Sequence, residues 1–218
     1  MNARQTAWDR LTALPPVLTL PLLCRSQEWT TEQASVYVAR WVKKGLLTLA
    51  GPRTGVYFNH VADPEAPANH RVSALLTIHP TAMLAGESVL HGAGWTTQTP
   101  TAVSVAVLAR PTLPQVDGFT LLPRPRRWFL AQHAHRVAPE EAAWSTHGLF
   151  SLPPALALLD AYADARAWHP DPDDLDVDEA GRAEVVRWAH EGRGALPEPL
   201  RQAWGLATVA APRRGLSR

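Results

Sequence analysis

The stretch TTEQASVYVARWVKKGLLTLAGPRTGVYF, residues 30–58, decides the fold of the N-terminal part of the chain. Thr30 followed by Gln33 at the third helical position is a capping-box pattern, which predicts a helix starting here. Apolar residues then recur at the spacing of one helical face, and this predicts a buried stripe made of Ala34, Val38, Trp41 and Val42. Gly45 is expected to end the helix in a left-handed conformation.

The residues after this helix predict a β-hairpin. Residues 46–49 form a short apolar strand, residues 50–55 (AGPRTG) a tight turn, and residues 56–58 a return strand. A further apolar segment, residues 18–27, has the length of about two helical turns. A short helix, a turn, an amphipathic helix and a hairpin with a basic tip are the layout of a winged helix-turn-helix, which we expect over residues 1–60.

In that layout the second helix enters the major groove of double-stranded DNA and the hairpin tip lies against the phosphate backbone. We therefore expect four side chains to face bases, namely Gln33, Val36, Tyr37 and Arg40. Phosphate contacts are expected from Lys43, Lys44 and Arg53. Thr31 and Thr54 complete the candidate DNA-binding set.

Composition excludes several classes of protein. The chain has 218 residues, of which 46% are hydrophobic, enough for one large domain or two small ones. No apolar run approaches the roughly 18 residues of a membrane-spanning helix. The first residues lack the pattern of a signal peptide, and the lone Cys24 suits a reducing compartment, so a cytoplasmic protein without membrane partners is expected.

The net charge of +1 hides a gradient along the chain. Residues 1–60 hold seven Lys or Arg and three Asp or Glu, a charge of +4. Residues 61–150 are neutral with six of each, and residues 151–218 hold eight Arg and eleven acids, a charge of −3. This asymmetry favours an anionic partner for the N-terminal part alone.

Beyond residue 60 the pattern predicts a linker, an α+β domain and a tail. Residues 61–69 (VADPEAPAN) read as the linker, 70–210 as the domain and 211–218 as a flexible tail. Helices are expected at 70–79, 81–90, 155–165, 179–190 and 199–207. Strands are expected at 101–109, 119–122, 128–131 and 148–152. The predicted fold class is therefore α+β, a winged helix-turn-helix followed by a mixed C-terminal domain.

Part of this domain resembles a known family. The pattern AGESVLHGAGWTTQTPTAVSVAV (residues 85–107), the basic segment 123–127 and GLFSLPPALALLDAYAD (residues 148–164) resemble the C-terminal domain of AbiEi-type antitoxins. Upstream, WVKKGLLTLAGPRTGVYF (residues 41–58) is similar to the end of that family's winged helix. The resemblance spans about residues 15–168 and rests mostly on apolar and glycine positions.

The resemblance implies two activities. The N-terminal domain would repress its own operon by binding an operator, usually inverted repeats. The C-terminal domain would counteract a cognate nucleotidyltransferase-like toxin of a type IV (abortive-infection) system. For the surface that meets such a partner, the candidates are the basic residues Arg124, Arg126 and Arg127 and the acidic residues Asp173, Asp174 and Asp176.

No catalytic, metal or cofactor motif stands out. His133 and His135 would share one face of a strand but lack a third ligand at a diagnostic spacing. The aspartates of residues 171–178 lack the glycine and glutamate of a calcium loop. The strand after Gly86-Glu87-Ser88 carries no carboxylate for the two-metal chemistry of a nucleotidyltransferase. We expect no cofactor and no enzyme activity.

Three other functions stay open on the sequence alone. The winged helix could dock a partner protein instead of DNA, and the chain could act as a stand-alone regulator without a toxin. An enzyme with an unrecognised site, around His133, His135 and Asp160, is the third possibility.

Overall fold

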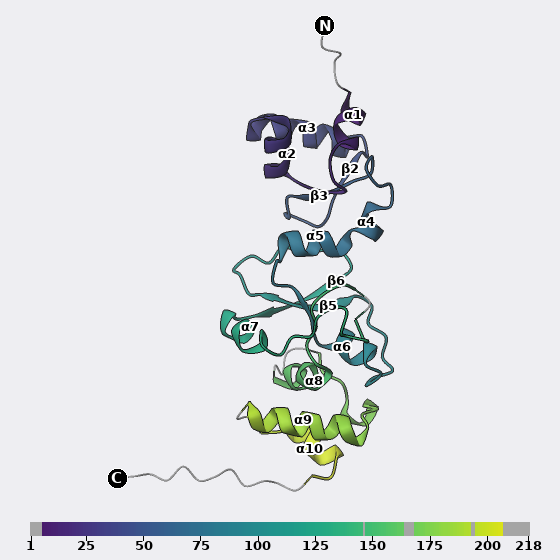
Figure 1. Cartoon of the computed structure of the whole chain (residues 1–218), viewed down its shortest axis with the longest axis vertical. Coiled ribbons are helices and arrows are strands. Elements are labelled where there is room, and N and C mark those ends of the chain that lie inside the picture. Colours follow the sequence, from purple (N-terminus) through teal and green to yellow (C-terminus); the bar gives the residue numbers. More distant parts are fainter. Residues whose placement is uncertain (1–5, 146, 164–167, 193–194, 207–218) are drawn as a thin grey trace, which may run out of the picture.

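A computed structural model describes residues 6–145, 147–163, 168–192 and 195–206. The N-terminal part consists of α1 (Ala7–Thr12), β1 (Val17–Thr19), α2 (Leu20–Gln27), α3 (Thr31–Lys43), β2 (Leu47–Leu49) and β3 (Val56–Asn59). The three strands form an antiparallel sheet in the order β1-β3-β2. The helices α2 and α3 lie on one side of this sheet (Figure 1).

The predicted helix over residues 31–43 is confirmed with its capping box. The Thr30 hydroxyl accepts a bond from the backbone N–H of Gln33, and the Gln33 side chain accepts one from the backbone of Thr30. Gly45 has the expected positive φ of 69°. Ala34, Val38 and Trp41 are buried as predicted. Val42 is 40% exposed, so its place in the stripe was wrong.

The segment over residues 18–27 is only partly helical. Its first residues belong to β1, where Val17 pairs with Phe58 and Thr19 with Val56. Thr19 then caps α2 and accepts a bond from the N–H of Leu22. Pro21 lies in the first turn of α2, where a missing N–H does no harm. Strand β1 closes the sheet by contacts distant in sequence, which a local pattern does not reveal.

The C-terminal part is built around a second three-stranded sheet, ordered β4-β5-β6. Strands β5 and β6 run parallel, and β4 is antiparallel to β5. Its elements are α5 (Arg71–Ile78), β4 (Met83–Leu84), α6 (Glu87–Gly92), β5 (Val103–Leu108), β6 (Phe119–Arg124), α7 (Arg126–Gln132), α8 (Pro154–Ala163), the 3-10 turn η1 (Pro172–Asp174), α9 (Glu179–Glu191) and α10 (Glu198–Ala203). The mixed α and β class is therefore confirmed.

Three local predictions in this part were wrong. Residues 81–90 are not one helix, because β4 pairs with β5 and Gly86, with φ of 58°, separates it from α6. Residues 128–131 are helical, since they belong to α7. Residues 148–152 do not form a full strand, because only Ser151 pairs with other segments, through isolated β-bridges to Leu84 and Val137.

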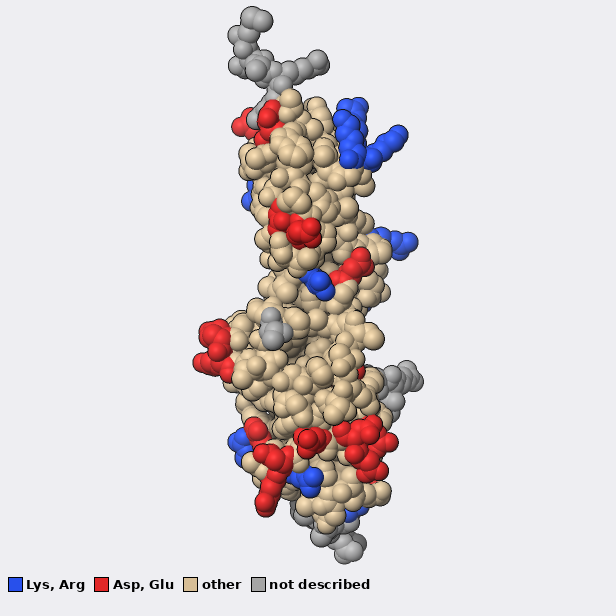
Figure 2. Space-filling view, turned by 90° about the vertical axis from the view of Figure 1, so that its right-hand side faces the viewer, with Lys and Arg blue, Asp and Glu red and all other residues tan. Residues whose placement is uncertain are grey.

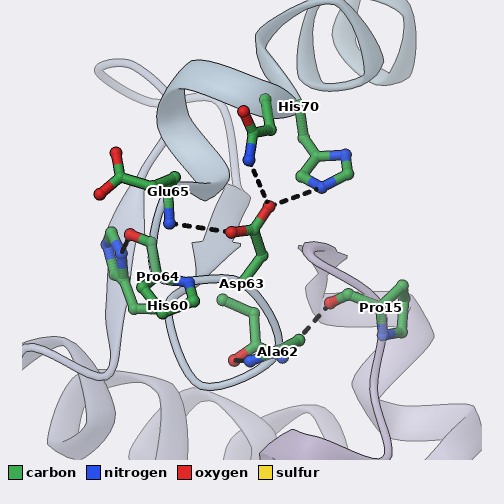
Figure 3. Close-up of polar contacts among 9 residues, drawn as sticks. Pro15, His60, Ala62, Asp63, Pro64, Glu65 and His70 are labelled. Atoms are coloured by element: carbon green, nitrogen blue, oxygen red, sulfur yellow. Dashed lines mark hydrogen bonds and ion pairs between the residues drawn. The ribbon is translucent and has the colours of Figure 1, made fainter.

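The segment expected as a linker, residues 61–69, is folded in the structure. It contains a turn and the helix α4 (Ala66–Asn69). Asp63 holds this segment together, since its carboxylate accepts bonds from the Glu65 backbone, the Asn69 amide and the His70 ring (Figure 3). The predicted tail, residues 211–218, lies outside the described residues.

The two parts meet along a shared apolar seam. Ala50, Val56, Phe58 and Ala66 belong to the same buried cluster as the C-terminal sheet, whereas α1, α2 and α3 enclose a separate core. The molecule is elongated, with α5 between the N-terminal part and the second sheet and with α9 and α10 at the far end (Figure 1). None of the helices in the described ranges combines the length and apolar character needed to cross a membrane.

Candidate nucleic-acid interface

The outward face of α3 is exposed to solvent. Its inward side is fixed by the buried residues Ala34, Val38 and Trp41. The exposed side chains on the remaining surface are Thr31, Glu32, Gln33, Ser35, Val36, Ala39, Arg40, Val42 and Lys43. Lys44 follows as an exposed C-cap residue. All nine predicted DNA-binding residues thus lie on α3, at its C-terminus or in the hairpin turn, with exposed or half-buried side chains.

Positive charge gathers at the C-terminal half of this helix. Arg40, Lys43 and Lys44 form no ion pair with any described residue, so their charges face solvent. Cations are also favoured there by the negative end of the helix dipole. The single acid of the helix, Glu32, lies in the first turn, and a bond from its own backbone N–H and one from Thr30 lower its pKa.

Tyr37 differs from the prediction that it faces bases. Its ring stacks on Trp29 with centroids 4.2 Å apart and an angle of 14° between the planes, and it also contacts Trp41. The Arg10 guanidinium from α1 lies 5.1 Å from the Trp29 centroid and covers the same cluster. Tyr37 is therefore a half-buried packing residue. Arg10, a cation beside α3, was missed because nothing in the local sequence links α1 to this surface.

The turn between β2 and β3 is held by the C-terminal part. The backbone of Gly51 lies so close to Gln115 that a Cβ would collide with the Gln115 carbonyl oxygen. The Thr54 hydroxyl donates to the Gly51 carbonyl at 2.8 Å, so it is used within the turn. Arg53 is exposed and has a positive φ of 59°. Its side chain remains free to contact an anion at the tip.

The predicted partner-binding arginines do not form one group. Arg124, expected on a partner-binding surface, ends β6 and is only 8% exposed, because its guanidinium binds the Asp160 carboxylate at 2.8 and 3.1 Å. Arg126 and Arg127 begin α7 and are exposed. The burial of Arg124 was not predictable locally, since Asp160 lies 36 residues away.

The acidic segment forms a separate surface at the other end of the molecule. Asp173, Asp174 and Asp176 are exposed in and after η1, and the Gln98 amide donates to Asp174 at 3.2 Å. On the face shown in Figure 2, most acidic side chains lie over the C-terminal end, with a few basic ones among them, while basic side chains project from the N-terminal end, which also carries some acidic ones. The charge gradient along the sequence is thus also a gradient along the long axis.

The histidines singled out in the sequence do not share a strand. His133 and His135 follow α7, and the His135 ring packs against the edge of Trp188 at 4.7 Å. Across the described ranges no three His, Cys, Asp or Glu side chains lie close enough together to hold a metal ion. Cys24 is half-buried on α2.

Comparison with known proteins supports the fold. No protein-family model matches the chain, and no curated protein matches it. Among solved structures, the crystal structure of the Rv2827c protein from Mycobacterium tuberculosis is similar, with 18% identity and a TM-score of 0.54. The match covers 97% of this chain and 85% of that chain. The overall fold of this chain is therefore similar to one that has been observed experimentally.

Proposed function

We propose that residues 1–60 are a winged helix-turn-helix that binds double-stranded DNA. The element order α1-β1-α2-α3-β2-β3 and the antiparallel sheet with β3 in the middle support this assignment. In such a domain α3 is the recognition helix, which lies in the major groove, and the β2–β3 turn is the wing. The observation that carries the proposal is the exposed face of α3, flanked by unpaired cations.

The charges support a binding mode on the DNA backbone. Lys43, Lys44 and Arg53 are exposed and would neutralise phosphates, while the acidic end of the chain lies far from α3 (Figures 1 and 2). Each phosphate contact adds about 0.9 to the slope of log affinity against log salt concentration. Near-neutrality of the whole chain is thus no obstacle, because the two ends carry opposite charge.

The test is a titration of the protein with DNA from upstream of its own gene, followed by fluorescence anisotropy over a range of salt concentrations. Lys44→Ala should weaken binding to all sequences alike and lower the salt slope by about one unit. Arg187→Ala removes the same charge from α9 and is the matched control, which should bind as the wild type does. Absence of binding at low salt would overturn the proposal.

We further propose that the protein is a cytoplasmic autorepressor and an AbiEi-like antitoxin, which counteracts a nucleotidyltransferase-like toxin. The supporting observation is that residues carrying the family resemblance converge in space. Gly86, Glu87 and Asp160 line a pocket of about 60 Å³ together with Arg124. Burial raises the pKa of Glu87 there.

This second role is tested by co-expression with the product of the adjacent gene. A neighbouring nucleotidyltransferase-like protein whose toxicity this chain suppresses would support it. Reversing the charges of Asp173, Asp174 and Asp176 should then reduce neutralisation if the acidic surface meets the toxin. A stable complex with a partner protein and no affinity for DNA would instead favour a protein-interaction module.

A further inference from the structure

We infer that α3 reads thymine methyl groups through Val36 and Ala39 and a neighbouring guanine through Arg40, while Gln33 reads no base. This inference rests on the proposed DNA-binding function and specifies the sequence that the site would take. It follows from a comparison of the side chains on the outward face, some of which already form hydrogen bonds within the protein while others form none.

The geometry of α3 places Val36 at the centre of the outward face. Successive residues are rotated by about 100°, so Val36 and Lys43 point almost directly away from the buried residues Ala34, Val38 and Trp41. Ala39 and Arg40 flank this line. Val36 is 49% exposed. Removing an apolar side chain of this kind from water is favourable, so the exposed Val36 would be stabilised by contact with an apolar group of a partner.

Val36 and Ala39 together form a small apolar spot, because residues three apart are neighbours on a helix surface. Neither carries a donor or an acceptor, so neither can read the hydrogen-bonding edge of a base. The major-groove feature that matches an apolar side chain is the C5 methyl group of thymine. Lys43 lies about one helical turn beyond Ala39, where it would contact the adjacent phosphate.

Gln33 is withdrawn from base recognition by the capping box. Its Oε1 accepts the Thr30 backbone N–H at 3.0 Å, and only the amide NH₂ remains unused. Reading adenine takes both ends of the carboxamide, one as donor and one as acceptor. A glutamine that contacts adenine in this way would have to release the helix N-terminus.

Arg40 is the remaining exposed group with two-pronged geometry. Its guanidinium lies 5.9 Å from the Tyr37 ring centroid, and Tyr37 is itself fixed by stacking on Trp29. A guanidinium held in this way can donate two bonds to O6 and N7 of guanine. Val36 and Arg40 are separated by about 6 Å along the helix axis, roughly two base pairs of DNA.

The experiment begins with in vitro selection of duplexes by the full-length protein. The selected site should contain a guanine within about two or three base pairs of a thymine. Each thymine is then replaced by deoxyuridine, which removes only the methyl group. One such replacement should weaken the wild type about fivefold and should weaken Val36→Ala clearly less, because the shorter alanine side chain loses part of the methyl contact.

Two further variants separate the roles of Arg40 and Gln33. Arg40→Ala should lose tenfold or more in affinity for the selected site and its preference for guanine. Gln33→Glu keeps a capping-box residue, and its selected site should be the same as that of the wild type. Circular dichroism of each variant checks whether its helix content is kept.

The outcomes separate the inference from the function on which it rests. If no duplex is selected at low salt, DNA binding itself fails. If duplexes are selected but deoxyuridine has no effect, or has the same effect on Val36→Ala, the thymine reading is wrong while DNA binding stands. A selected site that changes at an adenine in Gln33→Glu would overturn the statement about Gln33.

Discussion

At the scale of single residues, the Asn59 side chain at the end of β3 links two backbone segments, the one that ends α1 and the one that follows β3. It is fully buried; its amide donates to the Leu11 carbonyl at 2.8 Å, and its Oδ1 accepts from the backbone of Val61 and Ala62. Asn59→Ala would remove these bonds at a fully buried position, so the free energy of unfolding should fall by about 2 kcal/mol. Urea denaturation measures this, with the exposed Thr99→Ala as control. A loss below about 0.5 kcal/mol, the range of an ordinary surface substitution, would contradict the role given to Asn59.

At the scale of elements, Asp160 on α8 ties three of them together. Its carboxylate binds Arg124 of β6 and accepts the indole N–H of Trp128 of α7 at 2.7 Å. Asp160→Asn keeps the shape but removes a negative charge that contacts the buried Arg124 guanidinium, so unfolding should become easier, by up to about 3 kcal/mol. The double variant Arg124→Met/Asp160→Leu should recover much of this loss. Equal stability of Asp160→Asn and the wild type, by urea denaturation, would contradict the account.

The elements also show how far the sequence could predict this molecule. The capping box, the stripe and Gly45 predicted α3 because each signal is local. The helix α7 was missed, since an apolar run of four residues does not separate strand from helix. The two roles expected of Gln33 were in conflict already in the sequence, because its side chain could not both cap the helix and face a base. The packing of Tyr37 on Trp29 is a contact that only the structure shows. The burial of Arg124 required a partner that only the fold supplies.

At the scale of the whole molecule, Asp63 couples the junction between the two parts to pH. The Asn69 amide lowers the pKa of Asp63 most, followed by the Glu65 N–H, with His70 adding to it. Because the folded pKa lies below the unfolded value of about 3.9, the ionised group stabilises the fold above that pH. This contribution disappears as pH falls through the folded pKa. In acid titrations, Asp63→Asn should lose stability less steeply below about pH 4 than the wild type or the exposed Asp117→Asn control. Unchanged acid sensitivity would rule the coupling out.

The shared core predicts that both parts unfold together. Ala50, Phe58 and Ala66 are buried with residues of the C-terminal sheet, and the Gly51 backbone rests on Gln115. Calorimetry of the wild type should therefore show one transition with equal calorimetric and van't Hoff enthalpies.

Gly51→Ala forces a Cβ into the seam and should lower stability by about 1–3 kcal/mol, with the two enthalpies diverging as the parts separate. Gly55→Ala is the control: it strains a φ of 65° in open space, so it should lower stability while leaving a single transition. Two transitions in the wild type would mean that the seam does not join the parts, and the wing would then be free to move relative to the second domain.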